Sequence, residues 1–188
     1  MLEIARPQEQ YALRVGGAEL TRLHCEDADE LWALIQAERV HLDRWTPAAE
    51  ATHEEVRATL ERADRAWHTG FQFRFVLRRA GRIVGMCGFV DVFADPGVGE
   101  LGYWLARGAS GFGLATESVR VLTHAAFTEL GLQKAEVSTA MGNLPSRRLA
   151  ERLGFTLEGV RRRCERIASG DLVDHAIYGM LVEEWPAP

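Results

Sequence analysis

ELGYWLARGASGFGLAT, residues 100–116, is the stretch that decides the fold. Its first part is typical of a β-strand, because Leu101, Tyr103 and Leu105 alternate with other residues and aromatic side chains favour a pleated sheet. A glycine-rich turn follows over residues 108–113, and from Leu114 onward the apolar residues adopt helical spacing. The stretch therefore predicts a strand, a tight turn and a helix in immediate succession.

This order of elements can form a cradle for an anion. The first turn of a helix presents unpaired N–H groups and a partial positive charge, and glycine lets the backbone close around a phosphate. The turn lacks the lysine of a Walker loop, since Leu114 and Ala115 follow Gly113, and Thr116 stands where the dinucleotide fingerprint requires its third glycine. Glycine-rich turns before helices are also common without phosphate ligands, so this stretch alone leaves both interpretations open.

Length and composition predict one domain over residues 1–188, because a hydrophobic content of 47% can furnish a full core. A net charge of −5 argues against a general nucleic-acid binder. No apolar run approaches the roughly 18 residues of a membrane span, and the first ten residues lack the pattern of a signal peptide. We expect a cytoplasmic protein with no nucleic-acid or membrane partner.

The cysteines and histidines indicate neither disulfides nor a metal. Cys25, Cys87 and Cys164 are widely scattered and form no C-x-x-C pair, so we expect reduced thiols. The six histidines show no metal-ligand spacing. We therefore predict no metal site.

Hydrophobic periodicity and turn residues divide the whole chain into alternating elements. A capping box, Thr52-x-x-Glu55, opens the second predicted helix, and His41 to Pro47 before it is expected to be a loop. We predict helices over 27–38, 52–67, 114–130 and 143–153, and strands over 11–15, 18–23, 71–79, 83–93, 98–106, 134–139, 155–162 and 172–182. This succession favours an α+β or α/β fold around a mixed sheet.

A second informative cluster is Asn143-Leu-Pro-Ser146. Asn at an N-cap accepts a hydrogen bond from an early helical N–H, and Pro suits the first turn, so a structural role accounts for Asn143 by itself. Ser146 is by default a polar residue at a helix start. Because the helix dipole favours negative charge there, its hydroxyl is also suited to donate to an anion such as a thiolate.

A third cluster places one carboxylate, Glu165, among the four arginines of the segment 161–166. Such groups usually form a solvated charge cluster on the surface. If the segment instead lines a cleft, Glu165 is a candidate general base. His175 and Tyr178 on the last predicted strand are further titratable candidates, with surface and packing roles as the alternative.

Together, these clusters resemble the GNAT (general N-acetyltransferase) superfamily, and within it the RimJ/RimL branch of ribosomal-protein N-terminal acetyltransferases. The matching motifs are E-L-G-Y-W-L at 100–105, S-G-F-G-L-A-T-E at 110–117, N-x-x-S followed by G-F over 143–155, T-L-E-G-V at 156–160, D-H-A-I-Y at 174–178 and E-E-W at 183–185. The segment from His41 to Trp45 also resembles the acceptor-side loop of that branch. The resemblance covers nearly the whole chain in order.

The resemblance implies a V-shaped mixed sheet of about seven strands flanked by about four helices. Acetyl-coenzyme A would enter where the strands over 98–106 and 134–139 splay apart, with the pantetheine arm along 103–105 and the pyrophosphate at the glycine turn. No metal is implied, and homodimers are common in the branch. The implied cofactor contacts are Tyr103, Trp104, Leu105, Gly108, Ala109, Ser110, Gly111, Phe112, Gly113, Ala115, Asn143 and Ser146.

The resemblance also implies catalytic and acceptor roles. In the branch a glutamate follows the motif serine by nineteen positions, which makes Glu165 the expected base and places Ser146 near the sulfur. Other GNAT branches carry a tyrosine acid seven residues after the asparagine, where this chain has Ala150, so Ser146 or water must protonate the thiolate. The acceptor pocket is expected to be shaped by His41, Asp43, Arg44 and Trp45.

The implied reaction is direct attack of an amine on the thioester, with oxyanion stabilisation by backbone N–H near Trp104 and Leu105. No cysteine stands at a position expected to face the cofactor, so a covalent acetyl-enzyme is not predicted. An α-amine has a pKa of about 7.7–8.0, against about 10.4 for lysine, so a weak carboxylate base suits an N-terminal amine better.

Two alternatives stay open beside an N-terminal α-amine of a protein or peptide. A small-molecule amine, such as an aminoglycoside or polyamine, would require an acidic pocket, which Glu26, Asp29, Glu38 and Asp43 could supply. A non-catalytic acyl-coenzyme A sensor would need neither Ser146 nor Glu165, so the presence of both residues argues against it.

Overall fold

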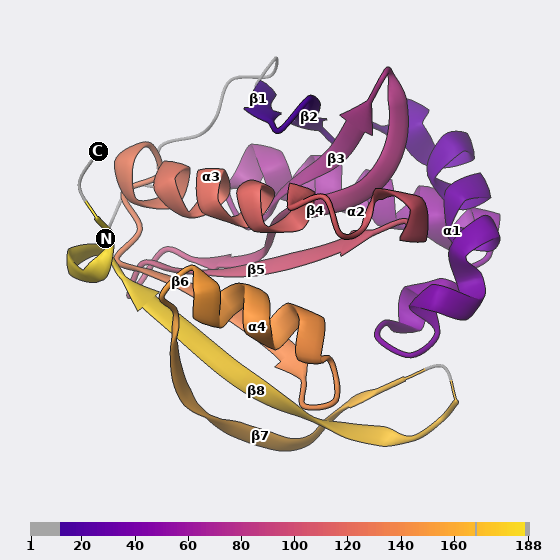
Figure 1. Ribbon diagram of the computed structural model, residues 1–188. Helices are drawn as coiled ribbons and strands as arrows, with labels where there is room; N and C mark the ends of the chain where they lie inside the picture. The colour runs from indigo at the N-terminus through magenta and orange to yellow at the C-terminus, as the bar shows by residue number, and fades with distance from the viewer. Residues whose placement is uncertain (1–11, 168, 187–188) are drawn as a thin grey trace.

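Eight strands form one mixed sheet in the order β1-β2-β3-β4-β5-β6-β8-β7 within residues 12–167 and 169–186, the part of the chain that the computed structural model describes (Figure 1). Four α-helices accompany the sheet over the same residues. The strands are β1 (Ala12–Val15), β2 (Ala18–Arg22), β3 (Phe73–Arg79), β4 (Arg82–Phe93), β5 (Val98–Leu105), β6 (Lys134–Ala140), β7 (Thr156–Arg166) and β8 (Leu172–Leu181). The helices are α1 (Ala28–Leu42), α2 (His53–Thr69), α3 (Leu114–Thr128) and α4 (Leu144–Arg152).

The pairing of β5 with β6 gives the sheet its V shape. All other neighbouring strands are antiparallel, whereas β5 and β6 are parallel and pair only from Val98 to Leu101 and from Lys134 to Val137. Beyond these residues the two strands diverge, which leaves the facing edge of β5 from Gly102 to Leu105 without a partner strand. The predicted V-shaped mixed sheet is confirmed, with eight strands rather than about seven.

The helices cover both faces of the sheet because side chains alternate along the strands. On β5, Leu101, Tyr103 and Leu105 belong to one core cluster with residues of α3 and α4, whereas Trp104 joins a second cluster with residues of α1 and α2. Figure 1 shows α3 and α4 in front of the sheet and α2 behind it. None of the helices within the described residues is long and apolar enough to cross a membrane.

Local sequence signals placed most element ends correctly. The capping box is confirmed, since the side chain of Thr52 accepts from the backbone N–H of Glu55 and the carboxylate of Glu55 accepts from that of Thr52. Asn143 is confirmed as the N-cap of α4. The glycine turn ends at Gly113, which is the N-cap of α3.

Two boundaries differ from the prediction by four residues. Helix α1 continues to Leu42 instead of Glu38, because Leu42 is only 2% exposed and extends the buried stripe of Leu31 and Ile35, so His41 is helical rather than in a loop. Strand β7 runs to Arg166 rather than Arg162, since pairing with β8 continues past a bulge. The first residue of the strand predicted over 11–15, and the N-terminal segment considered as a signal peptide, lie outside the described residues.

Candidate active site

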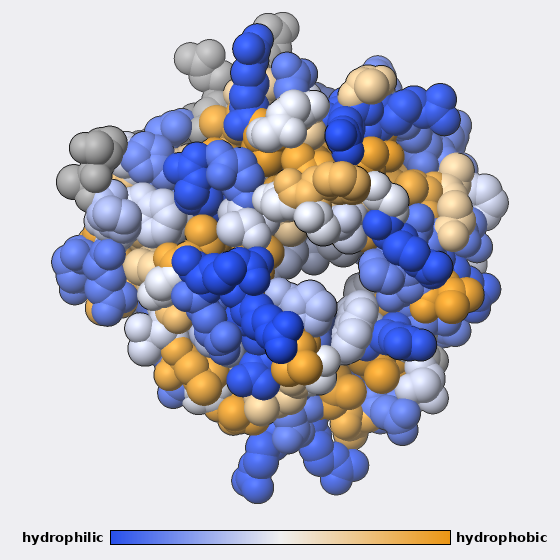
Figure 2. Space-filling view, in the orientation of Figure 1, coloured by the Kyte–Doolittle hydropathy of each residue, from blue (hydrophilic) through white to orange (hydrophobic). Residues whose placement is uncertain are grey.

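A cavity of about 1230 Å³ occupies the gap where β5 and β6 diverge. Side chains from both core clusters reach it, including Leu114 from α3, Trp104 from β5 and Leu31 from α1. Figure 2 shows the molecule hollowed near the centre of the face that Figure 1 presents. We call this space the central cavity. Its volume lies above the roughly 300–1,000 Å³ typical of small-ligand pockets.

The glycine turn opens into the central cavity at the N-terminus of α3. Gly111 and Gly113 have φ values of 86° and 78°, a left-handed conformation that glycine adopts without strain. No side chain caps α3, and a Cβ added at Gly108, Gly111 or Gly113 would meet nothing within 4 Å. The first-turn N–H groups are therefore free of a cap, as an anion site requires.

The residues of the predicted cradle do not all face the same way. Ser110, Gly111, Gly113 and Ala115 line the central cavity. Three others do not: Gly108 lies in a short 3-10 turn (Arg107–Ala109), Ala109 is buried in the core, and Phe112 is exposed. The guanidinium of Arg79 lies 5.3 Å from the centre of the Phe112 ring.

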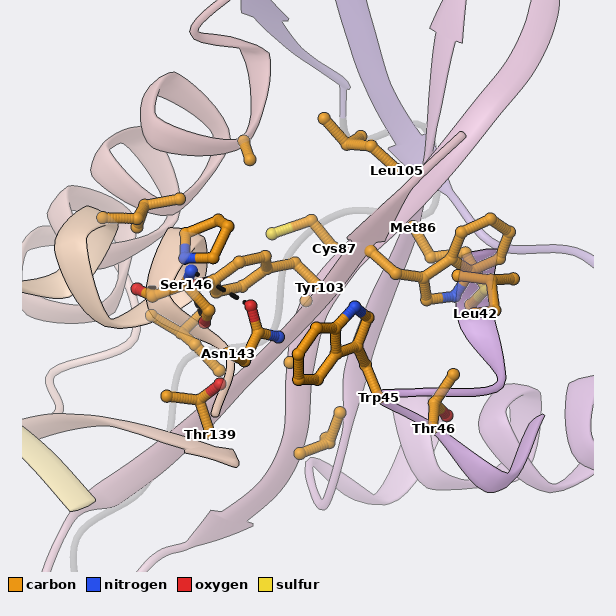
Figure 3. A pocket seen from close by; sticks show the side chains of 18 of the residues that line it. Leu42, Trp45, Thr46, Met86, Cys87, Tyr103, Leu105, Thr139, Asn143 and Ser146 are labelled. Atoms are coloured by element: carbon orange, nitrogen blue, oxygen red, sulfur yellow. Dashed lines mark hydrogen bonds between the residues drawn. The ribbon is translucent and has the colours of Figure 1, made fainter. Parts of the chain in front are cut away.

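Ser146 and Tyr103 form a hydroxyl pair inside the central cavity. Their oxygens are 2.8 Å apart, and Asn143 Oδ1 accepts a hydrogen bond of 3.3 Å from the backbone N–H of Ser146 (Figure 3). Burial raises the pKa of Tyr103 to about 12, so its hydroxyl stays protonated at neutral pH. The sequence indicated only a backbone role for Tyr103. Its contact with Ser146 depends on α4 packing against β5.

A bulge in β7 brings Glu165 to the central cavity. Arg161 pairs with His175, but Glu165 pairs with Val173, so β7 carries two extra residues between these pairs. If the same residues paired without a bulge, Glu165 would lie opposite Asp171 instead of Val173, two residues farther from His175 along β8. Arg163 adopts a φ of 49° in the bulge, and its N–H donates to the carboxylate of Asp174 at 2.7 Å.

The bulge aligns Glu165 with two other polar side chains. Glu165 Oε2 lies 2.8 Å from His175 Nε2, and His175 Nδ1 lies 2.9 Å from the hydroxyl of Ser138. The first contact is an ion-pair distance rather than an aligned hydrogen bond, since Nε2 has no hydrogen-bond partner of good geometry. All three residues line the central cavity, so Glu165 is not part of a purely solvated charge cluster. The structure does not place Tyr178 there: it is fully buried and accepts a hydrogen bond from Arg147.

Glu100 is a cavity-lining carboxylate that sequence reasoning missed. It lies on β5, opposite Asp91 of β4 and Glu136 of β6. Burial, and then the Asp91 carboxylate, raise the pKa of Glu100, against the opposing influence of Arg161 and His175. Glu100 opens the decisive stretch of sequence, but its carboxylate neighbours are adjacent only through strand pairing.

The acceptor-side segment reaches the central cavity through two of its four predicted residues. His41 and Trp45 line the cavity, whereas Asp43 and the exposed Arg44 do not. Trp45 projects between Met86 and Asn143 in Figure 3, and its Cζ3 lies 3.9 Å from the position of a Cβ added at Gly142. The ring therefore reaches across the cavity from the end of α1 to the turn before α4.

The acidic residues suggested for a polyamine-type pocket lie elsewhere. Glu26, Asp29, Glu38 and Asp43 are not among the lining residues. Glu38 instead accepts from the backbone N–H of Arg107 at 3.1 Å, and Asp29 contacts His53 at 2.7 Å. The carboxylates that line the central cavity are Glu100, Glu165 and Glu117, the last of which pairs with Arg120.

Two cysteines line the central cavity, contrary to expectation. They are Cys87, next to Tyr103 in the strand register, and Cys164, next to Glu165 in sequence. Burial raises the pKa of the Cys87 thiol to about 12. Because the thiolate is the nucleophilic form, this cysteine is poorly suited to accept an acetyl group.

Comparison with known proteins relates both the sequence and the fold to acetyltransferases. A model of the acetyltransferase (GNAT) domain family matches residues 18–156. The uncharacterised N-acetyltransferase p20 of Bacillus licheniformis is 33% identical over 114 residues, covering 61% of this chain and 64% of that protein. The "Putative ribosomal N-acetyltransferase YdaF" of Bacillus subtilis is 30% identical over 168 residues, covering 87% of this chain and 90% of that protein. Mycobacterium smegmatis RimJ, in complex with CoA-disulfide, superposes with a TM-score of 0.85 at 25% identity, covering 96% of this chain and 90% of that one.

Proposed function

The chain belongs to the GNAT family of acetyl-coenzyme A-dependent N-acetyltransferases, and from this premise we propose that it acetylates the N-terminal α-amine of a protein or peptide. One observation carries the proposal: a single cavity joins an uncapped glycine turn to the Ser146–Tyr103 pair and to the carboxylates Glu165 and Glu100. The ribosomal acceptor named for YdaF supports a protein N-terminus as the class of acceptor.

The residues of the divergent strands fit acetyl-coenzyme A as a substrate. Backbone N–H groups at the start of α3 suit the pyrophosphate, and the unpaired edge of β5 from Gly102 to Leu105 offers hydrogen bonds to an extended pantetheine amide chain. The amine acceptor then approaches from the opposite side, past Trp45 and Trp104. Both substrates meet where β5 leaves β6.

The residues of this chain then perform three tasks: they remove a proton from the amine, stabilise the oxyanion and protonate the thiolate. Glu165, directly or through water, takes a proton from the amine as nitrogen bonds to the thioester carbon, and backbone N–H groups near Trp104 face the developing oxyanion. When the carbon–sulfur bond breaks, Ser146 passes a proton to the thiolate and regains one through water from the protonated Glu165, while the Tyr103 hydroxyl, 2.8 Å away, holds the Ser146 hydroxyl in place. The raised pKa of the Cys87 thiol argues against a covalent acetyl-enzyme at that cysteine.

Glu100 is the alternative base on the other wall of the central cavity. The raised pKa of Glu100 lies closer to the pKa of an α-amine than an ordinary carboxyl pKa does, which favours proton transfer between the two groups. Glu165 and Glu100 also leave room for the second candidate function, acetylation of a small cationic amine, because both carboxylates line the central cavity.

The test is release of free thiol from acetyl-coenzyme A in the presence of N-terminal peptides, aminoglycosides and polyamines. Turnover with peptides above that with the small amines supports the proposal, and the reverse order supports the second function. Cofactor binding without thiol release from any acceptor would contradict both and favour an acyl-coenzyme A sensor. E165Q and E100Q then assign the base: the variant that lowers kcat/KM and flattens its rise with pH has lost it.

A further inference from the structure

Arg74 lines the central cavity beside a row of two glycines on the neighbouring strands. Its neighbours in the sequence, Phe73 and Phe75, belong to the core under α3, so Arg74 faces the opposite side, toward α1 and α2. Across the sheet it pairs with Gly88 of β4, which pairs with Gly102 of β5. Two successive glycines therefore lie between Arg74 and the point where β5 leaves β6, and the Val90 side chain leans over Gly102.

Larger side chains flank this glycine row on both sides. Met86 pairs with Trp104 on one side, and Val90 and Glu100 follow the glycines on the other. All of them line the central cavity. The glycine row therefore leads from Arg74 to the acceptor side of the proposed reaction centre.

The guanidinium of Arg74 has no partner within the described part of the chain. Arg74 is half-buried, its Nε is shielded from water without a hydrogen bond, and no carboxylate lies within ion-pair distance. Burial lowers its pKa, Asp91 opposes that shift from farther away, and Arg62 adds to it. Buried polar groups in native proteins are nearly always hydrogen-bonded, so an unpaired cation here indicates a missing anionic ligand.

Two other arginines near Arg74 in the sheet, one on each face, do have carboxylate partners. Arg78, farther along β3, contacts Asp27 and Glu30. Arg22 on neighbouring β2 lies 2.6 Å from Asp64. The absence of a partner at Arg74 is thus a local feature of the cavity wall.

We propose that Arg74 binds an anionic group of the acceptor, so that the preferred acceptor is a peptide with an acidic side chain at its first or second residue. Two strand spacings of about 4.8 Å separate Arg74 from Gly102. An arginine side chain and two residues of extended peptide, at about 3.3 Å each, span this distance. The inference rests on the proposed function, because it specifies the acceptor of the same reaction.

The test uses peptides that differ only in having Glu, Gln or Lys at the second residue. Because a hydrogen-bonded ion pair discriminates strongly, the wild type should favour the Glu peptide over the Gln peptide by about tenfold or more in kcat/KM. R74M should abolish this preference, and R74K, which keeps the charge but not the planar fork, should retain part of it. R14M, at an exposed position of β1 outside the cavity, is the matched control and should keep the full preference.

A second measurement does not depend on turnover. Calorimetry on the enzyme with coenzyme A should show tighter binding of the acetylated Glu peptide than of the Gln peptide, with the difference lost in R74M. Equal kcat/KM or equal affinity for the two peptides in the wild type would overturn the role of Arg74, even if both are acetylated. Absence of thiol release from every amine would instead refute the proposed function, and the binding comparison would still decide on Arg74.

Discussion

At the scale of single residues, the site depends on side chains whose chemistry is set by their neighbours. Ser146 is a helix-start residue that meets the Tyr103 hydroxyl at 2.8 Å, and Glu165 meets His175 at 2.8 Å. Burial changes two further groups, since it raises the pKa of Glu100 and holds Tyr103 protonated. Each of these properties requires residues that lie far apart in the sequence.

S146A should lower kcat by up to about 100-fold while leaving the KM for acetyl-coenzyme A nearly unchanged, because the lost hydroxyl acts on the departing sulfur. Y103F keeps the ring and removes only the hydroxyl that holds Ser146 in place, so its decrease in kcat should be smaller. Steady-state thiol release measures both. Normal turnover by S146A would reduce Ser146 to a structural residue, and S169A, at an exposed turn, serves as the control.

E100Q should be more stable than the wild type near neutral pH. Since the folded state raises the pKa of Glu100 above its ordinary 4.5, it binds that proton more firmly than the unfolded chain does. The free energy of unfolding of the wild type therefore falls as the pH rises just above 4.5. E100Q has no carboxyl group at this position, so its free energy of unfolding does not fall for this reason. Urea denaturation should show the difference between the two proteins at about pH 7 shrinking toward about pH 4. A wild type as stable as E100Q at about pH 7 would contradict this assignment.

At the scale of elements, two departures from regular structure build the site. The glycine turn delivers an uncapped helix start to the central cavity. The two-residue bulge in β7 shifts Glu165 along β8 until it lies next to His175. Bulges commonly re-aim side chains in this way near active sites.

Deleting Arg162 and Arg163 should remove the bulge and straighten β7, so that Glu165 stays opposite Val173 but the bend no longer aims its carboxylate at the central cavity. The deletion variant should then lose activity to the same extent as E165Q, while its far-UV circular dichroism stays that of a folded protein. R163G is the matched control, because glycine accepts the φ of 49° without strain and should preserve activity. Full activity in the deletion variant would show that Glu165 needs no bulge.

At the scale of the whole molecule, the divergence of β5 and β6 separates two parts of one sheet, and the substrates are proposed to bind between them. Trp45 reaches from the end of α1 to the turn before α4 across the central cavity. The prediction of a single domain over the chain and the expectation of a homodimer stay predictions.

Thermal unfolding should show one cooperative transition, as expected if one sheet carries both cores. Coenzyme A at about 100 times its Kd should stabilise the folded state by about 2.7 kcal/mol. For a chain of this length that corresponds to a rise in Tm of roughly 5–10 °C. Scanning calorimetry with and without coenzyme A measures both, and two separate transitions would contradict the single-domain prediction.

The sequence by itself determined the order of elements, the turn before α3 and the caps of α2 and α4. These features depend on residues close together in the chain, such as Thr52 with Glu55, Asn143 with Ser146, and glycines that adopt positive φ. Together with the family resemblance, they predicted the V-shaped sheet and Glu165 as the candidate base. Local hydrogen bonding and steric limits suffice for such signals.

Only the tertiary structure decided how the side chains converge. The Tyr103–Ser146 pair, the carboxylate neighbours of Glu100 and the unpartnered Arg74 all depend on strand register and helix packing. Whether a residue is shielded from water and which charges surround it are properties of the folded molecule, and these determine its pKa and its need for a ligand.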